Sequence, residues 1–275
     1  MTATKLQAEV SQIWIYPVKS LSGIALKSCR TTSRGLMHDR RFMVVDAAGE
    51  FLTQRDYPVM ATVWTEILED ALELSHADHD PVLVPLNPTP KPTRAVRVWS
   101  NIVQAHAVSE EADAWLSEVI GLPVQLVYMP DSSERPCSDS YAKNGEIVSF
   151  ADGYPVLVTL EESLAELNAR IKIRDPKHHP LPMNRFRANI VLNGLQAWSE
   201  DNFKELQIGS AQFSAVKPCG RCQVTTTDQA TGLVEGPEPL LTLSSYRQTE
   251  VGIIFGMNLV VVADGVVSCG DKLAV

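Results

Sequence analysis

Residues 13–20 read IWIYPVKS and show most clearly the pattern that recurs along this chain. β-Branched and aromatic residues fill Ile13–Val18, and the polar pair Lys19-Ser20 closes the run, which is the pattern of a short strand. Similar runs, bounded by Gly, Pro, Asn or Asp, recur at residues 41–45, 95–99, 190–192 and 259–262. The chain is therefore predicted to consist mainly of short β-strands.

Two segments have the spacing of amphipathic helices instead. Thr159 and Glu162 are placed as a capping box, and the apolar residues that follow share one face: Leu160, Leu164, Leu167 and Ile171. Ser109 precedes a second, similar pattern at Ala112, Trp115, Leu116 and Val119. Together with strand-like runs on both sides of the Pro-rich residues 130–144, these helices predict a β-rich α+β fold.

The turns and Pro-rich stretches divide the chain. Residues 46–49, DAAG, are predicted to form a hairpin turn between two strand-like runs. Residues 80–93 are expected to form a long loop within a domain, and residues 130–144 a domain boundary or an active-site loop. We therefore expect two domains, residues 1–130 and 131–275.

Composition excludes several classes of protein. The 275 residues are 45% hydrophobic and carry a formal charge of −9, so a nonspecific nucleic-acid binder is excluded. No run approaches the roughly 20 apolar residues that span a bilayer, and the N-terminus lacks the apolar core of a signal peptide. We expect a cytoplasmic protein without a membrane partner, whose five scattered cysteines are reduced thiols.

The most informative motif is residues 217–222, KPCGRC. It brings Cys219 and Cys222 close together and flanks them with cations, which favour the thiolate that binds soft metals. Three other interpretations stay open: a structural zinc site, although no second pair of ligands is visible, a thioredoxin-like dithiol, and two thiols buried as small apolar groups. Residues 223–227, QVTTT, favour a strand after the motif, which speaks against the dithiol.

Cations at the ends of strand-like runs form a second pattern. Lys19 with Ser20, Arg40 and Arg187 each adjoin an apolar run, where a long charged side chain needs a partner. A guanidinium group can donate two parallel hydrogen bonds to a phosphate. These residues would therefore hold an anion if the fold brought them together. The sequence alone does not bring them together.

Six motifs in a fixed order resemble the MOSC family with its N-terminal β-barrel domain, and in particular its members that reduce N-hydroxylated compounds, such as the mitochondrial amidoxime-reducing component. They are residues 15–20 (IYPVKS), 39–40 (DR), 149–155 (SFADGYP), 186–189 (FRAN), 217–222 (KPCGRC) with Thr225-Thr226, and 243–247 (LSSYR). The resemblance implies a MOSC-type β-barrel domain that follows an N-terminal β-barrel-like domain.

The resemblance also implies a molybdenum cofactor, a pterin dithiolene with a phosphate. By residue-to-residue correspondence, Cys222 would ligate the metal and Cys219 would not. The residues implied to contact the cofactor are Lys19, Ser20, Arg40, Arg187, Asn189, Thr225 and Thr226. Gly153-Tyr154 departs from the Thr-Ser pair of the mitochondrial members, which puts the pterin contacts there in doubt.

The implied reaction is two-electron reduction of a small N-oxygenated substrate. The chain shows neither the membrane anchor of the mitochondrial members nor the ferredoxin domain of some bacterial ones, so we expect a separate electron donor: a flavoprotein reductase, with or without an iron–sulfur or haem carrier. Asp152 and Asp228 stay open as general acids, and both also suit a turn. The rival interpretation is a carrier of the cofactor, or of sulfur as a Cys222 persulfide, without turnover.

Overall fold

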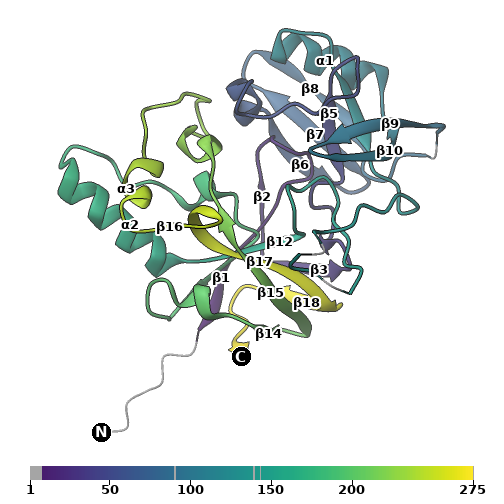
Figure 1. The fold of residues 1–275 in the computed structure, drawn as a ribbon. Coiled ribbons are helices and arrows are strands. Elements are labelled where there is room, and N and C mark those ends of the chain that lie inside the picture. Colours follow the sequence, from purple (N-terminus) through teal and green to yellow (C-terminus); the bar gives the residue numbers. More distant parts are fainter. Residues whose placement is uncertain (1–7, 90, 139, 143, 275) are drawn as a thin grey trace, which may run out of the picture.

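The computed structural model describes residues 8–89, 91–138, 140–142 and 144–274. Its ribbon forms two lobes (Figure 1). One lobe holds α1 (Glu110–Ile120) and most strands of the first half of the chain. The other holds α2 (Glu161–Arg174), α3 (Leu240–Ser244) and the largest sheet. The predicted β-rich α+β class is confirmed.

The large sheet is mixed and includes strands from both ends of the chain. Its strands run in the order β19 (Leu273–Ala274), β14 (Glu205–Ile208), β15 (Ala211–Gly220), β17 (Gly252–Ala263), β12 (Val156–Leu160), β13 (Ile190–Asn193), β1 (Glu9–Ile15) and β2 (Ile24–Leu26), with β16 (Gln248–Thr249) beside β17. β12 and β13 are parallel, whereas β1 pairs antiparallel with β13. Because β1 and β2 precede residue 130, a division there would cut through this sheet. The predicted domains 1–130 and 131–275 stay a prediction.

The first lobe contains two smaller sheets and α1. One sheet has the order β5 (Phe42–Val45), β11 (Gln125–Tyr128), β10 (Asn101–Ala107) and β9 (Thr93–Val98), and the other is β6 (Trp64–Leu68), β7 (Ala71–His76) and β8 (His79–Pro85). Their inward side chains, such as Phe42 and Leu72, share an apolar core with Leu116 of α1. A third small sheet, β18 (Val266–Ser268), β3 (Ser28–Thr32) and β4 (Gly35–Leu36), lies at the other lobe (Figure 1).

Helix α1 is confirmed together with its predicted cap. The side-chain oxygen of Ser109 accepts a hydrogen bond from the amide of Ala112 at 3.3 Å. The helix ends at Gly121, whose φ of 84° is the left-handed conformation that glycine adopts without strain.

Helix α2 is also confirmed, but its predicted capping box is wrong. Thr159 lies in β12, and its hydroxyl faces the sulfur of Met183 at 3.3 Å. Leu160 is the N-cap and makes no side-chain cap bond. Pairing with β13 extends β12 through Leu160, so the helix starts later, with Glu161 and Glu162 favourably placed at its positive end.

The remaining predictions are partly confirmed. The five runs predicted as strands overlap β1, β5, β9, β13 and β17. The turn at residues 46–49 forms, with the Gly49 amide 3.0 Å from the Asp46 carbonyl. The prediction of a loop over residues 80–93 is wrong for its first half, because β8 pairs with β7 there.

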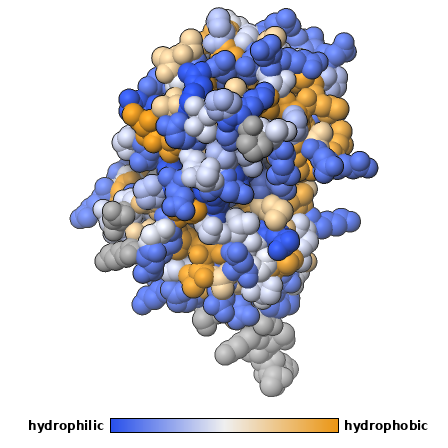
Figure 2. Space-filling model, turned by 90° about the vertical axis from the view of Figure 1, so that its right-hand side faces the viewer, coloured by the Kyte–Doolittle hydropathy of each residue, from blue (hydrophilic) through white to orange (hydrophobic). Residues whose placement is uncertain are grey.

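The surface of the molecule is mainly hydrophilic on the face seen in Figure 2, where hydrophobic side chains gather in separate groups. Within the described ranges, no helix combines the length and the apolar character that crossing a membrane requires.

Candidate functional site

Segments far apart in the sequence line one cavity of about 130 Å³. Lys19, Arg40 and Arg55 come from the first part of the chain, and Arg187 and Arg221 come from the second. Among the other lining residues are Ser20, Asp152, Gly153, Tyr154, Asn189, Cys219, Cys222 and Thr225. The fold thus brings together all but one of the predicted site residues, the exception being Thr226.

Lys19 enters the cavity where the chain turns away after β1. Its amide donates to the carbonyl of Phe42 at 2.8 Å, which fixes the turn against β5. Its buried ammonium group pairs with the carboxylate of Asp152. Burial lowers the pKa of Lys19, and Asp152 counteracts that effect. The next residue, Ser20, has a φ of 68°, a conformation that is uncommon outside glycine.

Arg40 is held by a buried carboxylate. Its Nη1 donates to both oxygens of Asp39, at 2.8 and 2.7 Å, and its Nη2 donates to the carbonyl of Arg187 at 3.2 Å. Arg40 and Arg187 both adopt left-handed backbone conformations, with φ of 47° and 54°. Strained backbone persists only where its surroundings enforce it, and it often lies at functional sites.

Asn189 has no free donor for a ligand. Its Nδ2 donates to the carbonyl of Trp14 and to Asp39, at 3.1 and 3.0 Å. Its Oδ1 accepts from the amide of Leu157 and from Arg40, at 3.1 and 3.2 Å. Asn189 therefore orients the side chains of Arg40 and Asp39 through these hydrogen bonds. Its direct contact with a cofactor stays a prediction.

Arg187 is a cavity cation with one side-chain acceptor and no paired carboxylate among the described residues. Its Nη1 is 3.4 Å from Gln229 Oε1, and its Nη2 is buried without a hydrogen-bond partner among the described residues. Burial, followed by the nearby charge of Arg40, lowers the pKa of Arg187 to about 10. A buried guanidinium group without a counter-ion is costly, so this position favours an anionic ligand.

The two cysteines of the motif have different surroundings. Cys222 is exposed, whereas Cys219 is partly buried and packs against an apolar cluster. Arg221 donates from Nη1 to the sulfur of Cys219 at 3.0 Å and from Nη2 to the carbonyl of Phe186 at 2.6 Å. Cys222 therefore presents a thiol to the cavity, while Cys219 helps to hold Arg221.

The segment after Cys222 is a turn rather than the strand that its composition favours. Residues Gln223–Thr226 form the 3-10 helix η4, because the hydroxyl groups of Thr225 and Thr226 bond backwards to the carbonyls of Cys222 and Gln223, at 3.0 and 2.7 Å. Thr225 lines the cavity; Thr226 is buried beside it and is absent from the lining. Their predicted contacts with a cofactor stay predictions.

Comparison with known families agrees with this geometry. Residues 7–123 match the MOSC N-terminal beta barrel domain, and residues 145–274 match the MOSC domain. The chain belongs to the MOSC family. The resemblance seen in the motifs and the fold class that it implied, a MOSC domain with an N-terminal MOSC β-barrel domain, are confirmed.

Curated relatives in the MOSC family differ in length. The chain is 31% identical to the mitochondrial amidoxime-reducing component 1 of Mus musculus, over 96% of this chain and 81% of the mouse protein. It is 30% identical to the Homo sapiens protein of the same name, over 96% and 82%. It is 34% identical to the molybdenum cofactor sulfurase of Oryza sativa, over 91% of this chain but 32% of the rice protein. The chain thus spans about a third of that relative.

Neither candidate acid of this MOSC chain suits proton donation at neutral pH. Desolvation raises the pKa of Asp152. The charge of Lys19 and the hydrogen bonds from Lys19 and the Trp99 indole lower this pKa by more, so it lies well below the usual value. Partial burial raises the pKa of Asp228, and two backbone amides and Arg185 bring the net pKa below normal. Both carboxyl groups are ionised at neutral pH.

Two residues at or next to the MOSC cavity were not predicted from the sequence: Arg55 lines it, and Arg135 lies behind the loop that carries Asp152. Arg55 lies on the ring of Trp99, 4.5 Å from its centroid, and its buried Nε is unpartnered among the described residues. Arg135 is buried and donates to the carbonyls of residues 149, 151 and 152, which shapes the loop that carries Asp152. No local pattern marks either residue, because the partners of each lie outside its own sequence segment.

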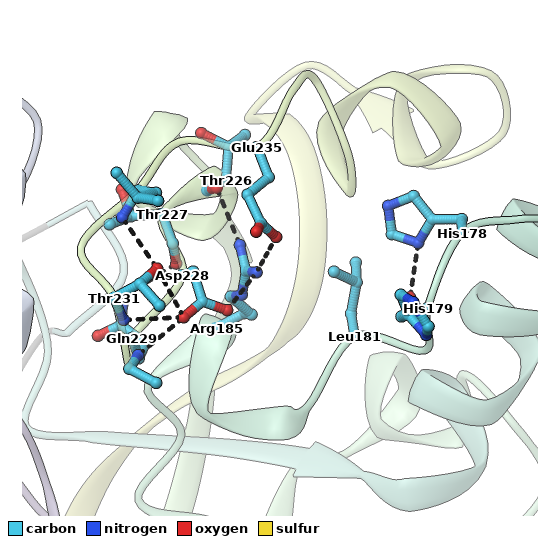
Figure 3. A network of polar contacts seen from close by, with 12 residues as sticks. His178, His179, Leu181, Arg185, Thr226, Thr227, Asp228, Gln229, Thr231 and Glu235 are labelled. Atoms are coloured by element: carbon cyan, nitrogen blue, oxygen red, sulfur yellow. Dashed lines mark hydrogen bonds and ion pairs between the residues drawn. The ribbon is translucent and has the colours of Figure 1, made fainter.

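The zinc interpretation finds no support in the MOSC fold. Within the residues that the structure describes, no group of three or more His, Cys, Asp or Glu side chains is arranged to hold a metal. In Figure 3, Leu181 lies between His178 and His179 on one side and the residues around Arg185 on the other, and Nδ1 of His178 is 2.6 Å from the carbonyl of His179.

The donor set fits an anionic cofactor. Five of the lining residues are cationic, namely Lys19, Arg40, Arg55, Arg187 and Arg221, and Asp152 is the carboxylate among them. Arg55 Nε, Arg187 Nη2 and Arg221 Nε are buried without partners in the described part of the chain. Unpaired N–H groups beside an exposed thiol match a ligand that combines phosphate oxygens with a thiophilic metal.

Proposed function

We propose that this protein is a molybdenum-cofactor-dependent oxidoreductase that reduces N-hydroxylated compounds. The observation that carries the proposal is that one cavity contains both the exposed Cys222 thiol and the Nη2 of Arg187, which is buried without a hydrogen-bond partner among the described residues. The relation to the amidoxime-reducing components supports the same reaction class. Their names specify the activity of those proteins, and the proposal extends it to this chain.

The residues of the cavity would divide the work of binding. Cys222 would supply a thiolate, the soft ligand that molybdenum accepts. Lys19, Arg40 and Arg187 would compensate the charge of the phosphate and pterin, with Asn189 holding Arg40 in position. When bound, the cofactor supplies two-electron redox chemistry, and the protein contributes orientation, charge and exclusion of water.

The proposal includes two partners. A small N-oxygenated molecule would enter the cavity beside Cys222, and a separate electron-donor protein would recharge the centre after each turnover. We propose a flavoprotein reductase as this donor, with or without an iron–sulfur or haem carrier. Such an encounter uses a small, transient interface.

Metal analysis followed by an activity assay tests the proposal. The protein is produced in a strain that makes the molybdenum cofactor, and molybdenum and zinc are measured. It is then reduced anaerobically with a chemical donor and offered benzamidoxime. We expect bound molybdenum, little zinc, and formation of benzamidine. Molybdenum-loaded protein that forms no benzamidine with any donor would overturn the reductase proposal.

A second candidate is a carrier of cofactor or sulfur without turnover. The 34% identity to a protein named molybdenum cofactor sulfurase favours it, and the exposed Cys222 thiol would be open to persulfide formation. Intact-protein mass spectrometry after incubation with a cysteine desulfurase and cysteine separates the candidates. A carrier would gain one sulfur atom at Cys222 and pass it on, whereas a reductase would show no transfer to an acceptor.

A further inference from the structure

Arg185 is a buried arginine outside the cavity, and its side chain connects two turns. It lies in the 3-10 helix η2 (Met183–Phe186), two positions before Arg187. Its Nη1 donates to the carbonyl of Thr226 at 2.9 Å, and its Nη2 donates to Oδ2 of Asp228 at 2.8 Å (Figure 3). Glu235 lies 3.5 Å from the same Nη2. One guanidinium group thus contacts the end of η4 and the loop that follows it.

Asp228 organises that loop with its other oxygen. Oδ1 accepts hydrogen bonds from the amides of Ala230 and Thr231, at 2.9 and 3.0 Å, and from the hydroxyl of Thr231 at 3.1 Å (Figure 3). The amide of Asp228 donates to the carbonyl of Leu233 at 2.7 Å, which closes the loop. The two carboxylate oxygens therefore have separate tasks: Oδ1 builds the turn and Oδ2 binds Arg185.

The two turns joined by Arg185 carry the central residues of the cavity. Residue 187 is the C-cap of η2, and Cys222 is the N-cap of η4. A second link runs the other way, because Arg221 donates to the carbonyl of Phe186 at 2.6 Å. Neither Arg185 nor Asp228 lines the cavity. Their contacts act on the cavity only through the backbone of the two turns.

We propose that Arg185 and Asp228 form a clamp of positioning residues that holds the Cys222 turn against the Arg187 turn. The role of the clamp in placing the two turns does not depend on the proposed function. Its role in holding a cofactor for catalysis rests on that function. The clamp needs arginine, since its planar fork reaches the Thr226 carbonyl and the Asp228 carboxylate at once. A lysine in its place keeps the charge and loses one of the two contacts.

Hydrogen exchange of the cofactor-free full chain tests the clamp directly. Arg185→Lys keeps the charge, and Asp228→Asn keeps an oxygen for the turn but places an amide donor opposite Arg185. The matched control is Arg247→Lys, because Arg247 makes a two-bond, partly buried pair with Asp201, at 2.6 and 2.8 Å, and neither residue lines the cavity. Peptides that cover residues 222–228 are followed by mass spectrometry in all four proteins.

We expect exchange in residues 222–228 to become roughly tenfold faster or more in both clamp variants, with no such change in the control. The amides concerned are those of Thr225 and Thr227, which bond to the carbonyls of Cys222 and Val224, and that of Asp228, which bonds to Leu233 in the following loop. Unchanged exchange in both clamp variants, or an equal increase in the control, would overturn the proposal.

Cofactor retention gives the second readout. After production in the cofactor-competent strain, both clamp variants should retain less molybdenum than the control. A clamp that changes exchange without changing molybdenum content would contradict its importance for the cofactor. Absence of molybdenum from all proteins, the unaltered chain included, would instead count against the proposed function and leave the exchange result standing.

Discussion

The guanidinium carbon of Arg187 lies 4.2 Å from the centroid of the Tyr16 ring. The guanidinium carbon of Arg40 lies 4.2 Å from the same centroid. The buried ring thus stabilises two neighbouring cations through its negative faces. The cations differ in their other partners, since Arg40 has the Asp39 carboxylate and Arg187 has no carboxylate at hydrogen-bond distance among the described residues. This difference gives different predictions for the stability of variants at the two arginines.

Arg40→Met and Arg187→Met should affect the cofactor-free protein differently. Loss of Arg40 leaves Asp39 as a buried carboxylate without its charged partner, which should lower the free energy of unfolding by about 3 kcal/mol. Loss of Arg187 removes a cation that lacks a counter-ion, so stability should stay within about 1 kcal/mol or rise. Urea unfolding measures both, and molybdenum analysis should show that both variants lose cofactor. Equal destabilisation would contradict the assignment of Asp39 to Arg40 alone.

Cys222→Ser should abolish reductase activity and leave the fold intact. The thiol is exposed, so the substitution should change the free energy of unfolding by less than about 0.5 kcal/mol. Serine is a poor ligand for a soft metal site, so molybdenum-dependent turnover should be lost. Cys219→Ser is the matched comparison and should be much milder. If both variants lose activity to the same extent, the dithiol interpretation gains support.

Glu200 predicts a pH-dependent stability. Its side chain is 0% exposed, Oε2 accepts from the hydroxyl of Ser163 at 2.8 Å, and burial raises its pKa from 4.5 to about 7. Between these values the folded state keeps a proton that the unfolded state has released, so this group's stabilisation is lost as the pH rises.

Glu200→Gln should remove that dependence. The variant should be more stable than the unaltered protein at pH 8, by up to about 3 kcal/mol, and nearly equal to it at pH 5. Urea unfolding at both pH values measures the difference. A variant that is equally destabilised at pH 5 and pH 8 would show that Glu200 is ionised and needed in that form.

Turnover should require a separate electron donor. The sequence contains neither the G-x-G-x-x-G pattern of a dinucleotide site nor a four-cysteine cluster pattern. The molybdenum-loaded chain should therefore fail to oxidise NADPH by itself and should turn over with a chemical donor or an added flavoprotein system. Reconstitution assays that omit each protein in turn measure this. NADPH-dependent reduction by the chain alone would reveal a missed redox centre.

Local sequence patterns were sufficient to predict many of the strands and helices and to name the candidate cysteines and cations of the site. Short β-branched runs predicted β1, β5, β9, β13 and β17, and Ser109 marked the start of α1, because strand and cap preferences act within a few residues. The local patterns failed at Thr159, where pairing with β13 keeps the residue in a strand, and at residues 223–226, where hydroxyl bonds favoured a turn over the β-favouring composition.

The tertiary structure alone decided which side chains meet and what each is free to do. Arg40 and Asn189 lie 149 positions apart and yet are hydrogen-bonded, and Arg185 reaches Asp228 across 43 positions. Only such contacts show that Asn189 has used its donors while Arg187 has one left, and that Asp152 and Asp228 are ionised. The availability of a polar group depends on its partners and its burial, and both arise from long-range packing that no local pattern encodes.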